Sequence, residues 1–339
     1  MNNTIQFLRG VSIIYILLLH STFMWKEEWR NIYFLYFDTA SGVELFFCIA
    51  GYFASKSIFI NDSFSFSNLC NFLIKKIKRL SPSLYIWGGI AYIWGTLSDP
   101  VKYGSSELLY KQLIATFVYA RNFLELESPH AFGYFWAVSL EMQFFIFFAI
   151  IVYLLNKNSS KINFIIAVIY MLLCIYRPGI LASDYFRIDA MLLGVLVYRL
   201  HKEAQILYII QQFDTLKTIY KKLILFILLI CLASSLKVFE SFSIFRITIT
   251  SILAAIITIL GVGKSSIIKT GVNFLDKVII KIGDLSYSIY VVHIISWWIA
   301  GDILSLIYKG NNIVLTWSFY IIFMIVSAYI NYKYVEKKF

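Results

Sequence analysis

Residues 7–20 read FLRGVSIIYILLLH, the start of an apolar helix with one charge at its front and one imidazole deep inside. Arg9 and His20 are about three helical turns apart, so their side chains lie on nearly the same face, roughly 16 Å apart along the axis. An ionisable group inside a membrane is costly and suggests function. Two interpretations stand here. Either Arg9 holds an anion while His20 moves a proton, or His20 is a neutral imidazole hydrogen-bonded within a bundle.

The composition places the whole chain in a membrane. It is 60% hydrophobic and only 14% charged, unlike soluble domains. Ten apolar runs approach the roughly 20 residues that a bilayer requires. They cover residues 5–25, 42–60, 80–98, 132–155, 162–177, 184–201, 221–236, 243–263, 284–306 and 312–333. We therefore expect an all-α polytopic bundle of about ten transmembrane helices. It should form one integral-membrane domain over residues 1–339, with no appended soluble domain.

The placement of the net charge of +11 predicts topology. When the runs are taken as alternating spans, 20 of the 30 basic residues fall on one side, and the positive-inside rule makes both termini cytoplasmic. Membrane lipids are the expected contact of these charges. Nucleic acid is not an expected partner, because the basic residues are not interleaved with aromatic ones. The four cysteines occur singly, without zinc spacing, so we expect no metal site.

A basic cluster precedes the third run, and the sequence leaves two uses open for it. Lys75, Lys76, Lys78 and Arg79 fall within five residues. Such a cluster can clamp phosphate groups, or it can anchor the chain to anionic lipid. Pro82 follows and is expected to mark where the next helix begins.

Two later runs carry further polar side chains. Glu141 lies in an aromatic run, where a carboxylate should pair with a cation or stay protonated. Trp136 is about 140° away around the same helix, so we expect Glu141 to face a cavity and Trp136 to pack. Ser286, Tyr290 and His293 follow the spacing i, i+4, i+7 along one helical face. This stripe indicates either a polar cavity or a buried structural network.

Three further features are expected to be structural. Glu44 lies near the outer mouth of the second run, so we predict that it is hydrated. Arg187 follows Asp184 by three residues, which favours a local ion pair. Residues 99–131 form one long insert between the third and fourth runs. We expect it on the external surface as a lid, a floor or an interfacial helix, with a mildly amphipathic stretch at residues 107–118.

Taken together and in this order, these motifs resemble the acyltransferase family 3 membrane proteins, bacterial O-acyltransferases of cell-surface sugars. The resemblance rests on Arg9 with His20, on the stretch from Phe46 to Gly51, on Lys76 with Arg79, on Trp136 with Glu141, and on Ser286, Tyr287, Tyr290 and His293. Three positions depart from the family pattern. Ala50 stands where serine is usual, Lys76 where arginine is usual, and Val138 where leucine is usual.

The resemblance implies transfer of an acyl group, usually acetyl, from cytoplasmic acetyl-CoA to a hydroxyl of a cell-surface or lipid-linked glycan. Such glycans include O-antigen and exopolysaccharide, and the enzyme would be a multi-pass protein of the bacterial cytoplasmic (inner) membrane. On this basis His20 is expected to be the general base and Glu141 a second catalytic residue. Arg9, Lys76 and Arg79 would bind the coenzyme. The expected substrate-binding residues are Trp136, Ser286, Tyr290 and His293.

Other interpretations remain open. A two-step route through an acyl-histidine competes with direct transfer. A transporter or flippase of a glycan-related solute would also need buried polar groups, but the sequence shows none of the repeats that many transporters carry. A purely structural or scaffold role would allow apolar replacements of Arg9, His20 and Glu141 with modest effect.

Overall fold

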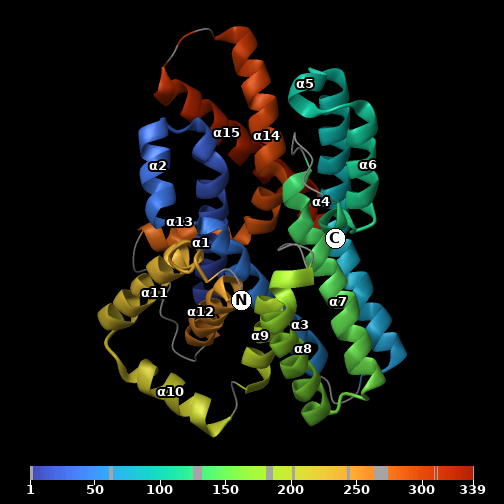
Figure 1. Ribbon diagram of the computed structural model, residues 1–339, viewed down its shortest axis with the longest axis vertical. Coiled ribbons are helices and arrows are strands. Elements are labelled where there is room, and N and C mark those ends of the chain that lie inside the picture. Colours follow the sequence, from blue (N-terminus) through green and yellow to red (C-terminus); the bar gives the residue numbers. More distant parts are fainter. Residues whose placement is uncertain are drawn as a thin grey trace. The chain divides into compact units, whose positions relative to one another are not determined.

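The computed structural model of the chain describes residues 3–60, 64–124, 132–180, 186–200, 203–242, 245–262, 274–308, 310 and 312–338 (Figure 1). Every regular element in these residues is a helix. The long helices are α1 (Asn3–Ser21), α3 (Gly42–Phe59), α4 (Phe66–Leu97), α7 (Trp136–Leu154), α8 (Ser159–Ile180), α11 (Thr218–Val238), α12 (Arg246–Val262), α14 (Ser286–Ile307) and α15 (Ile313–Tyr334). The shorter ones are α2 (Glu27–Tyr36), α5 (Pro100–Tyr103), α6 (Ser106–Phe117), α9 (Asp189–Leu200), α10 (Ala204–Thr215) and α13 (Phe274–Asp284).

Within the residues that the structure describes, six helical segments are long and apolar enough to cross a membrane, by length and composition. They are Asn3–Met24, Thr39–Phe59, Gly133–Leu154, Thr218–Val238, Ser286–Ile307 and Ile313–Lys338, and two shorter apolar helices, Ser159–Ile175 and Arg246–Val262, accompany them. The prediction of an all-helical chain with membrane-spanning helices is confirmed at this level. A helix also lies in each of the ten expected ranges, while the count of ten spans and the cytoplasmic termini stay predictions.

The chain divides into two compact units. The first unit comprises residues 1–72 and 144–284, and the second unit comprises residues 73–143 and 285–339. In the first unit, α3 and α9 touch backbone to backbone. A Cβ added to Gly51 would lie 2.0 Å from the carbonyl oxygen of Met191, and one added to Gly194 would lie 2.0 Å from that of Cys48. Only glycine permits this approach, which is typical of helix pairs in membranes.

The same kind of contact joins α1 to α13 in the first unit (Figure 1). A Cβ on Gly10 would lie 2.2 Å from the carbonyl oxygen of Ile279, and a Cβ on Gly283 would lie 1.9 Å from that of Gln6. Because each helix contributes a glycine to the contact, the two contacts together define where α13 lies along α1.

In the second unit, α6 runs antiparallel to the later half of α4. Gly95 lies against Leu109, Gly88 lies against Phe117, and Tyr85 donates a hydrogen bond to the carbonyl oxygen of Phe117 at 3.2 Å. The mildly amphipathic stretch predicted at residues 107–118 therefore forms most of α6, which packs along α4. The expected position of the insert on the external surface stays a prediction.

The expected helix start at Pro82 is wrong, because α4 is continuous from Phe66 to Leu97 with Pro82 inside. A proline removes one backbone donor, which a membrane helix tolerates when neighbouring helices supply polar contacts. Close to Pro82, the side chain of Asn331 of α15 contacts two side chains of α4. It accepts from the indole of Trp87 at 3.0 Å and donates to Ser83 at 3.0 Å and to Ser288 at 2.8 Å. This buried network ties α4, α14 and α15 together.

Candidate active site

Arg9 and His20 lie on α1 in the first unit, and α1 is uninterrupted between them. The two side chains therefore keep the predicted spacing. Arg9 is 7% exposed, and its guanidinium carbon lies 5.6 Å from the ring centroid of Phe46. Its Nη1 donates to Gln6 Oε1 at 3.3 Å. His20 is half-buried in the last turn of the helix. A cation and an imidazole thus lie at two levels along one apolar helix, about three turns apart.

Glu44 is not hydrated, contrary to the prediction. Its side chain is 1% exposed and forms a buried ion pair with Arg187. Asp184, the partner expected for Arg187, lies outside the described residues. The glycine contacts between α3 and α9 bring the starts of the two helices together, and a buried carboxylate needs a cation there. Asp189, at the start of α9, is also fully buried.

Of the basic cluster at residues 75–79, only Lys76 is buried. Burial, helped by the nearby charge of Arg79, lowers the pKa of Lys76 to about 8, although the carboxylate of Glu141 opposes this shift. The three charged groups therefore lie within electrostatic range of one another in the second unit. Two cations with one carboxylate form a net positive site, which suits an anionic ligand.

The stripe on α14 is buried at all three predicted positions, Ser286, Tyr290 and His293. His293 Nδ1 lies 2.7 Å from the carbonyl oxygen of Tyr290. A carbonyl oxygen only accepts, so Nδ1 carries the hydrogen of the neutral imidazole and the lone pair is on Nε2. This tautomer can accept a proton or a hydrogen bond at Nε2. The Oγ of Ser286 has no hydrogen-bond partner among the described residues.

Aromatic rings enclose His293 in the second unit. The ring centroids of Tyr134 and Trp297 lie 4.9 and 5.6 Å from that of His293, both edge to face. Tyr134 donates to the carbonyl oxygen of Val291 at 2.6 Å, and Tyr290 donates to the carbonyl oxygen of Tyr134. The imidazole is thus fixed in orientation. Trp136, the other substrate-binding candidate, is half-buried at the start of α7.

Two tyrosines lie within electrostatic range of Glu141: Tyr119, which no sequence pattern predicted, and Tyr287, which the sequence indicated only through the family resemblance. The hydroxyl of Tyr119 is 2.7 Å from that of Ser81, and Tyr287 donates to the carbonyl oxygen of Leu80. Burial raises the pKa of Tyr119 to about 12, so its phenol is protonated at neutral pH. Tyr119 has φ 57°, a left-handed conformation. Such backbone geometry leaves no signal in the sequence for a tyrosine.

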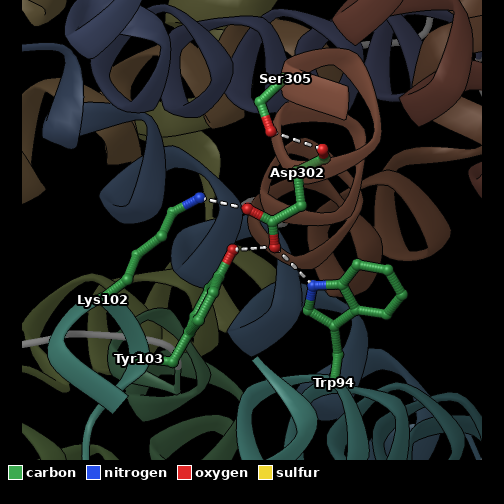
Figure 2. A network of polar contacts seen from close by, with 5 residues as sticks. All are labelled: Trp94, Lys102, Tyr103, Asp302 and Ser305. Atoms are coloured by element: carbon green, nitrogen blue, oxygen red, sulfur yellow. Dashed lines mark hydrogen bonds and ion pairs between the residues drawn. The ribbon is translucent and has the colours of Figure 1, made fainter. Parts of the chain in front are cut away.

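A second polar cluster, also missed, surrounds Asp302 of α14 (Figure 2). One carboxylate oxygen pairs with Lys102, and the other accepts from the indole of Trp94 at 2.8 Å and from the phenol of Tyr103 at 2.6 Å. Ser305 donates to the backbone carbonyl oxygen of Asp302 at 2.7 Å. The cluster fastens α5, at the start of the insert, to α14. All the acceptor atoms of the carboxylate are used by the protein, so we assign it to structure.

In the parts of the chain that the structure describes, no group of three or more His, Cys, Asp or Glu side chains could hold a metal ion.

The sequence of the chain is similar to those of known proteins. The family model described as an acyltransferase domain matches residues 2–332. Two Staphylococcus aureus proteins, from strains COL and MSSA476, are each named "Putative O-acetyltransferase". Each is 26% identical over 213 residues, which cover 56% of this chain and 33% of the relative. The chain therefore spans about a third of the length of these curated relatives. No solved structure matches the chain.

Proposed function

The chain belongs to the acyltransferase domain family, and from that premise we propose that it is a membrane O-acyltransferase. The reaction would move an acetyl group from acetyl-CoA to a hydroxyl group of a glycan. The observation that carries the proposal is the family match over residues 2–332, because every predicted site residue lies within it. The names of the relatives support acetyl as the acyl group and an oxygen atom as its acceptor.

The donor is proposed to bind through its phosphate groups. In the second unit, Lys76 and Arg79 provide two cations on consecutive turns of α4. In the first unit, Arg9 provides a guanidinium, the side chain whose fork of donors best fits phosphate oxygens. Binding the donor through its phosphate groups positions the thioester and so lowers the entropic part of the barrier to acyl transfer.

His20 is proposed as the general base. It takes the proton of the acceptor hydroxyl as that oxygen attacks the thioester carbonyl carbon. The new C–O bond forms, the C–S bond breaks, and the proton passes from the imidazole to the leaving thiolate, which gives free CoA. Glu141 is retained as a second catalytic candidate. Ser286, Tyr290, His293 and Trp136 are proposed to bind substrate, because the buried hydroxyl of Ser286 and Nε2 of His293 can take part in hydrogen bonds with it.

The acceptor is proposed to be a cell-surface or lipid-linked glycan of the O-antigen or exopolysaccharide kind. The protein would lie in the bacterial cytoplasmic membrane with both termini in the cytoplasm. The charge asymmetry of the chain supports this orientation, and it would give the basic cluster access to cytoplasmic acetyl-CoA.

The test is a comparison of surface glycan by mass spectrometry and proton NMR. The strains carry the wild-type gene, no gene, His20→Ala, or Leu18→Ala as a control at an exposed position of the same helix. Protein levels are matched. We expect the acetyl signal to disappear without the gene and with His20→Ala, and to persist with Leu18→Ala. An unchanged glycan in the strain without the gene would refute the proposed acceptor class. Full acetylation with His20→Ala would refute the base.

A further inference from the structure

The surroundings of Arg9 contain a relay of three side chains. Arg9 Nη1 donates to Gln6 Oε1 at 3.3 Å, and Gln6 Nε2 donates to Asp284 Oδ1 at 2.8 Å. Gln6 lies one helical turn before Arg9 on α1, whereas Asp284 is the last residue of α13, 278 residues away from Gln6. The relay therefore brings together two distant parts of the chain within the first unit.

The backbone contacts of α13 fix the carboxylate end of this relay. Gly283, the residue before Asp284, touches the backbone carbonyl of Gln6 itself, and Gly10, the residue after Arg9, touches that of Ile279. Both contacts exclude any Cβ. The backbone at Asp284 is thus held beside Gln6 by two close approaches of the main chain.

The chemistry of the amide explains why a carboxylate is needed there. A glutamine side chain has one accepting end and one donating end, and it can face a neighbour either way. Only the oxygen is compatible with a guanidinium, which has donors alone. Ionised Asp284 only accepts, so it binds the NH₂ end of Gln6 and turns the oxygen toward Arg9. The amide also orients the cation without placing a formal negative charge against it.

We propose that Gln6 and Asp284 are positioning residues for Arg9, and that they orient its guanidinium to receive a phosphate group of the acyl donor. This inference rests on the proposed function, in which Arg9 binds the coenzyme. Gln6 acts directly on Arg9, and Asp284 acts through Gln6. The pre-oriented fork of donors then loses less side-chain freedom when phosphate binds.

The test measures the affinity of purified full-length protein for CoA by isothermal titration calorimetry. The variants are Arg9→Ala, Gln6→Leu, Asp284→Leu and the double variant Gln6→Leu/Asp284→Leu. Loss of one hydrogen bond to a charged group should weaken binding about tenfold for Gln6→Leu and for Asp284→Leu. Because Asp284 acts through Gln6, the double variant should bind no more weakly than Gln6→Leu alone.

The matched control is Asp276→Leu, which removes another carboxylate of α13, one that pairs with Lys222 at 2.7 Å. It should bind CoA as the wild type does. A second readout separates positioning from folding: KM is compared for acetyl-CoA and for S-acetylpantetheine, which has no phosphate. The Gln6 and Asp284 variants should raise KM only for acetyl-CoA, and Asp284→Glu should restore it.

Each result has a distinct meaning. Arg9→Ala that binds CoA normally would refute the role of Arg9 in the proposed function and the inference with it. Weakened binding by Arg9→Ala with normal binding by Gln6→Leu would overturn the inference alone. Additive losses in the double variant, or an equal rise in KM for both donors, would also overturn it.

Discussion

Lys76 gives a prediction that couples stability to pH. It is 9% exposed, and burial with the neighbouring Arg79 lowers its pKa from 10.5 to about 8. The folded protein therefore carries this charge at a cost. The difference in pKa corresponds to about 3 kcal/mol at neutral pH. Lys76→Met keeps the apolar stem and removes the charge, so it should raise the free energy of unfolding by up to that amount.

The sign of the pH dependence follows from the lowered pKa. Below pH 8, Lys76 is protonated in both the folded and the unfolded chain, and the cost is fully present. Between pH 8 and 10.5 the folded chain loses the proton while the unfolded chain keeps it. The unfolded chain then binds more protons, so stability rises with pH. Above 10.5 the cost is gone.

The assay is chemical unfolding in detergent between pH 7 and 10 for wild type, Lys76→Met and Lys75→Met. Lys75 is the exposed neighbour in the same cluster. The wild-type curve should approach that of Lys76→Met as pH rises, and Lys75→Met should run parallel to the wild type. Parallel curves for wild type and Lys76→Met would refute the reasoning. The same variant should bind CoA more weakly at pH 7, so stability and proposed function change in opposite directions.

Three further predictions concern packing and hydrogen bonds. Gly51→Ala should lower the free energy of unfolding by about 3 kcal/mol, because the added Cβ meets a backbone carbonyl group. Gly89→Ala is the control and should not lower it, because nothing lies within 4 Å of a Cβ at that position. Equal thermal stability of the two variants would contradict this prediction. Asp302→Ala leaves the donors of Lys102, Trp94 and Tyr103 without their acceptor, so it should lower the free energy of chemical unfolding by about 2 kcal/mol. An unchanged free energy would mean that this carboxylate does not hold α5. Tyr119→Phe should lower the free energy of unfolding by about 1 kcal/mol, because it removes the hydrogen bond with Ser81. Adding Ser81→Ala should lower it no further in the same assay. Additive losses would argue against a hydrogen bond between the two side chains.

The helical fold could be predicted because it depends on local patterns. Apolar length alone placed a helix in each of the ten ranges. Gly42 and Gly51, two small residues of the second apolar run, both lie against backbone carbonyl groups of neighbouring helices. Small residues in an apolar run have few other uses. The spacing of Arg9 and His20 needed only an uninterrupted helix.

One error concerns a partner that is distant in sequence. The ion pair of Glu44 and Arg187 spans 143 residues, and nothing local distinguishes a hydrated glutamate from one that meets a buried guanidinium. The other error concerns Pro82, which lies inside α4. A proline favours the first turn of a helix but does not fix the helix start there. The roles of the site residues stay predictions, because no described contact involves a substrate.

The pair of Glu44 and Arg187 also sets an order of events during biosynthesis. The ribosome completes Arg187 143 residues after Glu44, a delay on the order of ten seconds. During that interval α3 holds a carboxylate whose counter-ion has not been made, and an unpaired carboxylate is costly to bury. The buried ion pair can form only after Arg187 has been made. The glycine contacts between α3 and α9 cannot form earlier either, because Met191 and Gly194 follow Arg187 in the chain.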